Sequence, residues 1–161
     1  EGRMKTALYV AVVARTYRQA VDDYFEDPNK YKERLPYYRE EIAKCTYRQF
    51  TTGFFFGPTD HETQIYDNNT YVRGYTYLGR VDEVTEDGLA VFDQKNKFSA
   101  GDEIELMMPE GENITALVER MYNEYGEVDS CPHPGERIWI RLSEPVRAGV
   151  ILRQEAGGGD E

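Results

Sequence analysis

Glycines divide the second half of the chain into short segments, and this spacing limits the fold more than any other feature. Five of them fall between apolar runs: Gly88, Gly101, Gly111, Gly126 and Gly135. Short runs of this kind, bounded by turn residues, are typical of strands rather than helices. Five or more in succession predict a small antiparallel barrel or sandwich.

The runs also alternate as strands do, with apolar side chains at every second position. The predicted strands are Tyr75–Val84 with a bulge at Gly79, Leu89–Asp93, Asp102–Met108, Ile114–Met121 and Arg137–Leu142. Because successive side chains of a strand point to opposite faces, only one face of each run can line a core. The side chains expected to point inward are Ile104, Leu106, Ile138 and Ile140.

The first part of the chain has helical character. Met4–Phe25 contains no Gly or Pro, and Asp27-Pro28-Asn29 ends the pattern. One apolar stripe consists of Val10, Val13, Tyr17, Ala20 and Tyr24, and a second face holds Ala7, Ala11 and Ala14. A helix with two apolar faces usually packs against something on both sides. We expect this chain to cover only one of the two faces, so the other should stay exposed and favour weak self-association. A short second helix is predicted over about Pro36–Lys44, with Pro in its first turn.

These patterns predict an α+β chain in four parts. Residues 1–46 form a helical arm, 47–70 an aromatic and then polar linker, 71–153 the small β-barrel, and 154–161 a disordered tail. Charge follows the same division, since the formal charge is +2 over residues 1–50 and −13 over residues 51–161. Non-specific nucleic-acid affinity depends on cations, so only the first part suits a phosphate backbone.

Cysteine usage and hydropathy exclude several classes of protein. Cys45 and Cys131 lie far apart and outside any Cys-x-x-Cys spacing, which argues against a disulfide framework, a zinc ribbon or a complete iron–sulfur site. No secretory signal opens the chain, and no apolar run approaches the roughly 20 residues of a membrane span. We therefore expect a cytoplasmic protein with no membrane partner.

Several motifs together resemble the collagenase-like peptidase family U32. They are Glu1-Gly2-Arg3-Met4-Lys5, the pairs Tyr9-Val10 and Tyr17-Arg18, the run from Arg48 to Phe55 (RQFTTGFF), Gly79-Arg80-Val81, Gly101–Glu105 and Pro132-His133-Pro134-Gly135. In that family the first motif closes the catalytic domain, and the later segments belong to a small C-terminal β-barrel. The resemblance extends to about Arg153 and predicts that this chain is a C-terminal piece of a larger protein.

The resemblance implies two alternative activities for the whole protein. Family members are known as peptidases or collagenases, whereas the better-understood bacterial relatives hydroxylate RNA bases, a tRNA wobble uridine among them, and carry an iron–sulfur cluster. The cluster cysteines lie upstream of the Glu-Gly-Arg segment and match neither Cys45 nor Cys131, so this chain is expected to hold no cofactor. The barrel also resembles the second domain of translation GTPases, which docks onto RNA or protein.

Glu1 and Arg3 are candidates for the edge of a catalytic site that this chain does not complete. A carboxylate and a guanidinium at a strand end can bind a polar substrate, or they can simply form an ion pair with each other. With the rest of the site absent, neither residue receives a catalytic role.

Arg48, Thr51, Thr52, Gly53 and Phe54 are candidates for binding a substrate or partner. Gly allows close approach of the backbone to a ligand, and aromatic rings can stack on a base. The alternative is that the phenylalanines of this segment attach the arm to the barrel.

Other polar clusters are interpreted as surface. Asp60-His61-Glu62 holds three possible metal ligands, but adjacent residues rarely converge on one ion, so a solvated loop and no metal site are expected. His133 lies between two prolines in a rigid turn. The sequence contains no recognisable Ser/His/Asp or Cys/His arrangement.

Trp139 is the candidate binding residue of the predicted barrel. It shares an outward face with Arg137 and Arg141, while Glu103 and Glu105 share another. If the two strands are neighbours, cross-strand ion pairs form; if they are not, Trp139 between arginines is a docking patch.

We therefore interpret the chain as an accessory region, inactive alone, that positions RNA or packs against its own catalytic domain. The rival hypothesis is the polypeptide-binding region of a genuine peptidase, and a third is a structural cap without a ligand.

Overall fold

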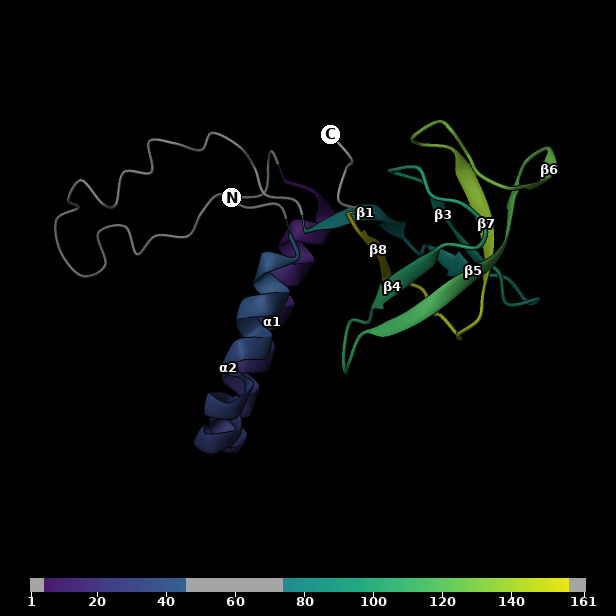
Figure 1. The fold of residues 1–161 in the computed structure, drawn as a ribbon. Helices are drawn as coiled ribbons and strands as arrows, with labels where there is room; N and C mark the ends of the chain where they lie inside the picture. The colour runs from purple at the N-terminus through teal and green to yellow at the C-terminus, as the bar shows by residue number, and fades with distance from the viewer. Residues whose placement is uncertain (1–4, 46–73, 157–161) are drawn as a thin grey trace, which may run out of the picture. The chain divides into compact units, whose positions relative to one another are not determined.

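A computed structural model describes residues 5–45 and 74–156 of the chain. The chain divides into two compact units, residues 1–74 and residues 75–161 (Figure 1). The described part of the first unit is a helical hairpin, and that of the second, called here the sheet unit, is a curled antiparallel sheet. The fold is therefore α+β, as the sequence pattern predicts.

The hairpin consists of α1, Ala7–Glu26, and α2, Pro28–Ala43. The hydroxyl of Thr6 caps α1 by accepting a hydrogen bond from the backbone N–H of Tyr9. Asp27 serves both helices, because its N–H donates to the carbonyl of Asp23 and its carboxylate accepts from the N–H of Asn29 at 2.9 Å. One residue thus ends α1 and begins α2.

The predicted start of the second helix at Pro36 is wrong. The proline of the first turn is Pro28, and Pro36 lies inside α2. A proline at the first helical position loses no hydrogen bond, and the Asp27 cap strengthens that start. Proline inside a helix costs about 3 kcal/mol, so α2 depends on its packing against α1 to continue through Pro36.

Only one face of α1 is covered by α2. Its buried residues are Leu8, Val12, Thr16 and Asp23, which recur at the spacing of a single helical stripe. On the opposite face exposure ranges from 47% to 81% for the large apolar side chains Val10, Tyr17, Val21, Tyr24 and Phe25. The prediction that an apolar face of this helix stays exposed is confirmed.

A buried polar cluster joins the two helices near their connection. Arg34 donates to Oδ2 of Asp23 at 2.8 Å, and the Tyr38 hydroxyl donates to the same oxygen. The Lys30 ammonium lies 2.8 Å from Oδ1 of Asp23. Burial opposes ionisation of Asp23, but the hydrogen bonds from Lys30 and Tyr38 and the charge of Arg34 outweigh it and hold the pKa of Asp23 below its ordinary value. Burial and the Asp23 carboxylate raise the pKa of Tyr38 to about 12.

The sheet unit holds eight described strands. They are β1 (Tyr75–Arg80), β2 (Glu83–Val84), β3 (Ala90–Asp93), β4 (Glu103–Met107), β5 (Ile114–Asn123), β6 (Gly126–Val128), β7 (Arg137–Leu142) and β8 (Ile151–Glu155). The order across the sheet is β1-β8-β4-β5-β7-β3-β2, and β6 pairs with β5 (Figure 1). The register of β1 against β8 shifts between Tyr77 and Gly79, so the predicted bulge is confirmed.

The ladder does not close into the predicted barrel, because β1 and β2 are its two edges. The predicted strand Tyr75–Val84 is interrupted at Val81 and Asp82. The N–H of Val81 donates to the carbonyl of Val150, just before β8, and the N–H of Asp82 donates to the carbonyl of Val91 in β3. The two edge strands are consecutive segments of one stretch of chain. They therefore join end to end and do not pair with each other.

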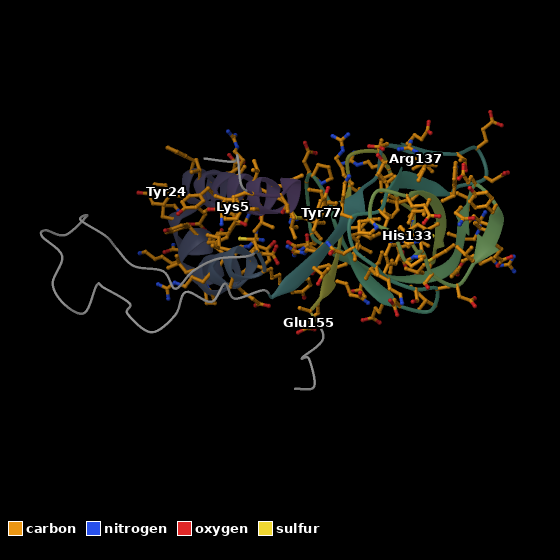
Figure 2. All side chains as sticks on the ribbon, turned by 90° about the horizontal axis from the view of Figure 1, so that it is seen from above. Lys5, Tyr24, Tyr77, His133, Arg137 and Glu155 are labelled. Atoms are coloured by element: carbon orange, nitrogen blue, oxygen red, sulfur yellow. The ribbon has the colours of Figure 1, made fainter. Side chains whose placement is uncertain are left out.

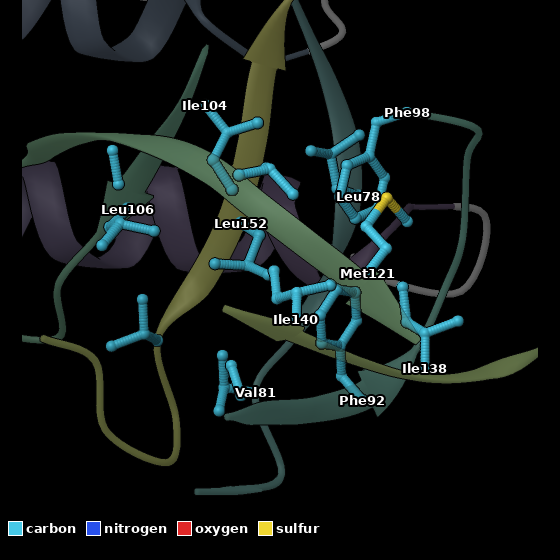
Figure 3. Close-up of a cluster of buried hydrophobic side chains, with 14 of the residues drawn as sticks. Leu78, Val81, Phe92, Phe98, Ile104, Leu106, Met121, Ile138, Ile140 and Leu152 are labelled. Atoms are coloured by element: carbon cyan, nitrogen blue, oxygen red, sulfur yellow. The ribbon is translucent and has the colours of Figure 1, made fainter. Parts of the chain in front are cut away.

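One hydrophobic core fills the inside of the curled sheet (Figure 3). The four side chains predicted to point inward all belong to it: Ile104, Leu106, Ile138 and Ile140. Each is no more than 2% exposed, so the alternation identifies the core face of β4 and β7 correctly.

Two strands are absent from the sequence prediction, the short β6 and the interior strand β8. In β8 three consecutive residues, Ile151, Leu152 and Arg153, are buried, so period-two alternation is lost. A buried arginine at the centre of a strand hides the signal that hydrophobicity would otherwise supply.

Candidate binding face on the sheet

Most of the predicted site residues lie outside the described ranges. Those concerned are Glu1, Arg3, Arg48, Thr51, Thr52, Gly53 and Phe54, together with Asp60-His61-Glu62. Trp139 lies within them, on β7, where Ile138 and Ile140 on either side face the core. Trp139 therefore points to the outer face of the sheet, as predicted.

The alternative of cross-strand pairs between β4 and β7 is excluded by the strand order. β5 lies between the two strands, so Glu103 and Glu105 cannot reach Arg137 or Arg141. Glu105 is instead paired in register with Arg153 of β8, and the two side chains form an ion pair. Of the two arrangements that the sequence allows, the structure contains the one with Trp139 flanked by arginines.

Arg137 is the centre of an ion-pair network at one end of this face. Its guanidinium lies 2.6 Å from a carboxylate oxygen of Asp82, 3.2 Å from Asp93 and 3.6 Å from Glu83. Figure 2 marks Arg137 on the sheet unit, where red oxygen atoms end many of the projecting side chains. The hydrogen bond from Arg137 is the main cause that holds the pKa of Asp82 below its ordinary value.

The other end of the face differs, because its cations lie opposite each other. Across β5 and β7, Tyr122 is paired with Trp139 and Arg120 with Arg141. Since paired residues of an antiparallel ladder share a face, the four side chains form a two-by-two block of two aromatic rings beside two guanidinium groups. Val91 of β3 pairs with Trp139 on its other side and is only 1% exposed. We call Arg120, Tyr122, Trp139 and Arg141 the Trp139 block.

Sequence reasoning missed half of this block. Arg120 and Tyr122 belong to a strand whose alternation is irregular, because the register of β5 against β7 shifts between Val118 and Arg120. Two strands that each carry an aromatic residue and an arginine two positions apart are visible in the sequence, but only the topology places them side by side.

A second feature that the sequence did not reveal is the buried Arg153. Its side chain is 0% exposed, forms an ion pair with Glu105, and lies 4.9 Å from the centre of the Tyr75 ring. A desolvated arginine needs such partners, because an unpaired buried charge is costly. Arg153 therefore ties β8 to both of its neighbours, β4 and β1.

His133 is exposed on the loop between β6 and β7, and Figure 2 marks its place on the sheet unit. The loop is held by Gln94, whose side-chain NH₂ donates to the Cys131 carbonyl at 2.7 Å and whose backbone carbonyl accepts from the backbone N–H of Gly135. Within residues 5–45 and 74–156, no group of three or more His, Cys, Asp or Glu is placed to bind a metal ion.

The two cysteines do not fit an iron–sulfur cluster. A cluster takes four thiolates, whereas the whole chain has two cysteines. Cys45 donates from its thiol to the carbonyl of Ile42 in the helical unit, and Cys131 is fully buried in the core of the sheet unit. Burial is the main cause that raises the pKa of the Cys131 thiol, and the nearby Glu136 carboxylate raises it further. Neither described helix is long and apolar enough to cross a membrane.

Two family models cover almost the whole chain. The model for the peptidase family U32 C-terminal domain matches residues 73–153, and the model for peptidase family U32 matches residues 1–65. The chain belongs to peptidase family U32. The resemblance seen in the motifs is thereby confirmed, and the sheet unit of this U32 chain corresponds to the family's C-terminal domain.

Named relatives of this U32 chain fall into two groups. It is 35% identical over 159 residues to the tRNA hydroxylation protein P1 of Bacillus subtilis, covering 96% of this chain and 37% of that protein. It is 30% identical over 162 residues to the tRNA hydroxylation protein P of Escherichia coli, covering 99% and 35%. A collagenase of Porphyromonas gingivalis is 28% identical over 149 residues, covering 91% and 41%.

The chain thus spans just over a third of the length of the tRNA hydroxylation proteins that it matches. A solved structure is also similar, the C-terminal domain of a Geobacillus thermoleovorans protein assigned to the U32 peptidases. That domain is 32% identical, with a TM-score of 0.45, over 50% of this chain and 92% of its own.

Proposed function

We propose that this U32 chain is an accessory region of a cytoplasmic protein that acts in RNA base hydroxylation. Its role is to present the substrate or a partner to a catalytic domain. The observation that supports the proposal is that proteins named for tRNA hydroxylation align with 96% and 99% of this chain, across both units. The Trp139 block supports a binding role, since tryptophan, tyrosine and arginine are the residues most enriched at binding hot spots.

The hairpin would serve as the connection to that catalytic domain. Its α1 carries a continuous apolar face that α2 leaves exposed, and a helix that is apolar on both sides normally lies inside a domain. In a full-length protein, packing of the catalytic domain on this face would fix the hairpin. An iron–sulfur cluster, if the full-length protein holds one, would be bound by residues other than Cys45 and Cys131.

The test is a strain that lacks the full-length gene. Mass spectrometry of its tRNA and rRNA nucleosides should show the loss of a hydroxylated base. The intact gene should restore that base, and a gene that lacks residues 75–161 should restore less of it at an equal protein level by immunoblot. An unchanged nucleoside profile contradicts the proposed activity, and full restoration without the sheet unit contradicts the accessory role.

A second candidate function is a polypeptide-binding region of a peptidase, which the relative named collagenase favours. In that case, full-length protein should hydrolyse gelatin, and the deletion strain should keep its hydroxylated bases. The two measurements on one strain and one protein separate the candidates.

A further inference from the structure

The Trp139 block places two like charges next to each other in a unit that is otherwise strongly acidic. Residues 75–161 contain eight Lys or Arg and nineteen Asp or Glu, a formal charge of −11 that equals the charge of the whole chain. Even so, Arg120 and Arg141 occupy directly opposite positions on β5 and β7. Like charges in directly opposed positions destabilise a sheet, and opposite charges are abundant in this unit. Stability alone therefore does not account for the pair.

Within the described residues, neither guanidinium group is held closely by a carboxylate. Arg141 donates to the backbone carbonyl of Asp87 at 2.9 Å. Arg120 has a carboxylate partner in Glu127, but the two groups lie 3.9 Å apart and both side chains are more than half exposed. A guanidinium has five N–H donors, so each arginine keeps donors for an incoming anion. The contrast is with Arg137, which three carboxylates surround.

The aromatic half of the block lies one step along the same strands. Trp139 and Tyr122 are paired in register, each two residues from one of the arginines. Trp139 is half-buried, and the buried Val91 is its register partner on the neighbouring strand β3. The block thus combines a pair of anion-binding forks with two flat apolar surfaces.

We infer that the Trp139 block binds single-stranded RNA, with a phosphate held between Arg120 and Arg141 and a base stacked on Trp139 or Tyr122. Guanidinium forks match the geometry of phosphate, and aromatic rings stack on any unpaired base. The inference rests on the proposed function, because the substrate class is drawn from it. It adds a site on the sheet unit, at residues that the family resemblance does not single out.

The net charge of −11 favours the helical part over the sheet unit for phosphate contact, so binding here depends on the local pair of arginines against a repulsive surrounding charge. The two arginines share one phosphate in this arrangement, so affinity for a single strand should fall with a slope of about −0.7 in log–log salt plots. The surrounding carboxylates make binding weak and detectable only at low ionic strength. Stacking of one base should contribute about 5- to 150-fold in affinity, a part that salt does not change.

The experiment uses the 161-residue chain and a fluorescently labelled single-stranded oligouridylate of about ten nucleotides, with anisotropy as the readout. The double variant R120Q/R141Q removes both forks. The matched control K95Q/K97Q removes the same charge from Lys95 and Lys97, which are exposed on the β3–β4 connection. Circular dichroism verifies that each variant is folded.

We expect R120Q/R141Q to lose at least about tenfold in affinity and its salt slope to approach zero, while K95Q/K97Q keeps the slope. The single variant Tyr122→Leu should weaken binding about five-fold or more with the slope unchanged. No saturable binding by the unmodified chain, or an equal loss in both double variants, overturns the site.

The nucleoside measurement separates this site from the proposed function. If the deletion strain loses its hydroxylated base but R120Q/R141Q binds RNA like the unmodified chain, the proposed function stands and the RNA site fails. If full-length protein with R120Q/R141Q modifies less RNA without any change in RNA binding, the face serves a protein partner, and the inference is again overturned.

Discussion

Gly79 is the position where one added methyl group should disturb the sheet unit most directly. A Cβ at this bulge would lie 2.3 Å from Cδ2 of Phe92 and 2.7 Å from Cε2. The ring cannot easily move aside, because Phe92 is 0% exposed and stacks on Phe98 with ring centres 6.3 Å apart. The backbone φ of Gly79 is not positive, so Gly79→Ala tests steric contact without backbone strain.

The size of the effect follows from two opposing contributions. Overpacking a well-packed core costs about 1–3 kcal/mol. Replacing Gly by Ala restricts the unfolded chain and returns about 0.4–1 kcal/mol. The steric cost exceeds the gain, and we expect a net loss of about 1–2 kcal/mol in the free energy of unfolding. For a unit of this size the melting temperature should fall by about 5–15 °C.

Fluorescence of Trp139 is a suitable assay, because it is the only tryptophan of the chain and lies in the sheet unit. Urea and thermal unfolding followed at this residue report the sheet without a contribution from the hairpin. The control is a double-mutant cycle with Phe92→Leu, whose smaller side chain should accommodate the new methyl group. The two changes together should cost less than the sum of the single changes, by about 0.5–3 kcal/mol. A Gly79→Ala protein as stable as the original, or strictly additive losses, would refute the steric reasoning.

Four further predictions concern the hairpin and the chain as a whole. Tyr17→Glu puts a charge on the exposed apolar face of α1 and should abolish self-association of the chain in light scattering. The control Lys32→Glu, on the surface of α2, should leave self-association intact, and a strictly monomeric unmodified chain would contradict the prediction. The pKa of Asp23 is lowered in the folded hairpin, so the ionised carboxylate stabilises the hairpin fully above the unfolded value of about 3.8, and this stabilisation is lost as pH falls through the lowered pKa. Asp23→Asn should remove this acid dependence of the helical circular dichroism, and an unchanged acid midpoint would count against it. The pKa of Tyr38 is raised from 10.0 to about 12, so its contribution is complete below pH 10 and is lost as pH rises through about 12, an alkaline transition that Tyr38→Phe should abolish. The purified chain should show no visible iron–sulfur absorbance and no hydrolysis of gelatin or casein; stoichiometric iron and sulfide in a monomer, or turnover that follows the protein peak, would overturn the interpretation of this chain as an accessory region.

The sequence predicts the fold best where a side chain's environment depends on its immediate neighbours. Alternation in β4 and β7 identifies the inward Ile104 and Ile140, and Gly79 marks the bulge, because both signals are local. The start of α2 at Pro28 is also a local signal, but the pattern at Pro36 competes with it. The Asp27 cap and packing against α1 together favour Pro28.

What the sequence alone could not provide is the adjacency of strands. The block around Trp139 needs β5 beside β7, and Arg153 needs β8 between β1 and β4. Both arrangements join segments that are far apart in the chain, so no window of sequence contains them. Arg153 shows the point most clearly, because a charged residue is fully buried through partners on two other strands.

The position of β8 has a consequence for the synthesis of the protein. β8 ends at Glu155 and pairs with both β1 and β4, so the sheet lacks an interior strand until the ribosome has made nearly all of the unit. During that time the edges of β1 and β4 that β8 later occupies present unpaired N–H and C=O groups, with the core residues beside them uncovered. A nascent or prematurely terminated chain therefore carries two adhesive edges that the finished protein does not have. Loss of β8 would lead to aggregation or degradation of the polypeptide rather than to a smaller stable domain.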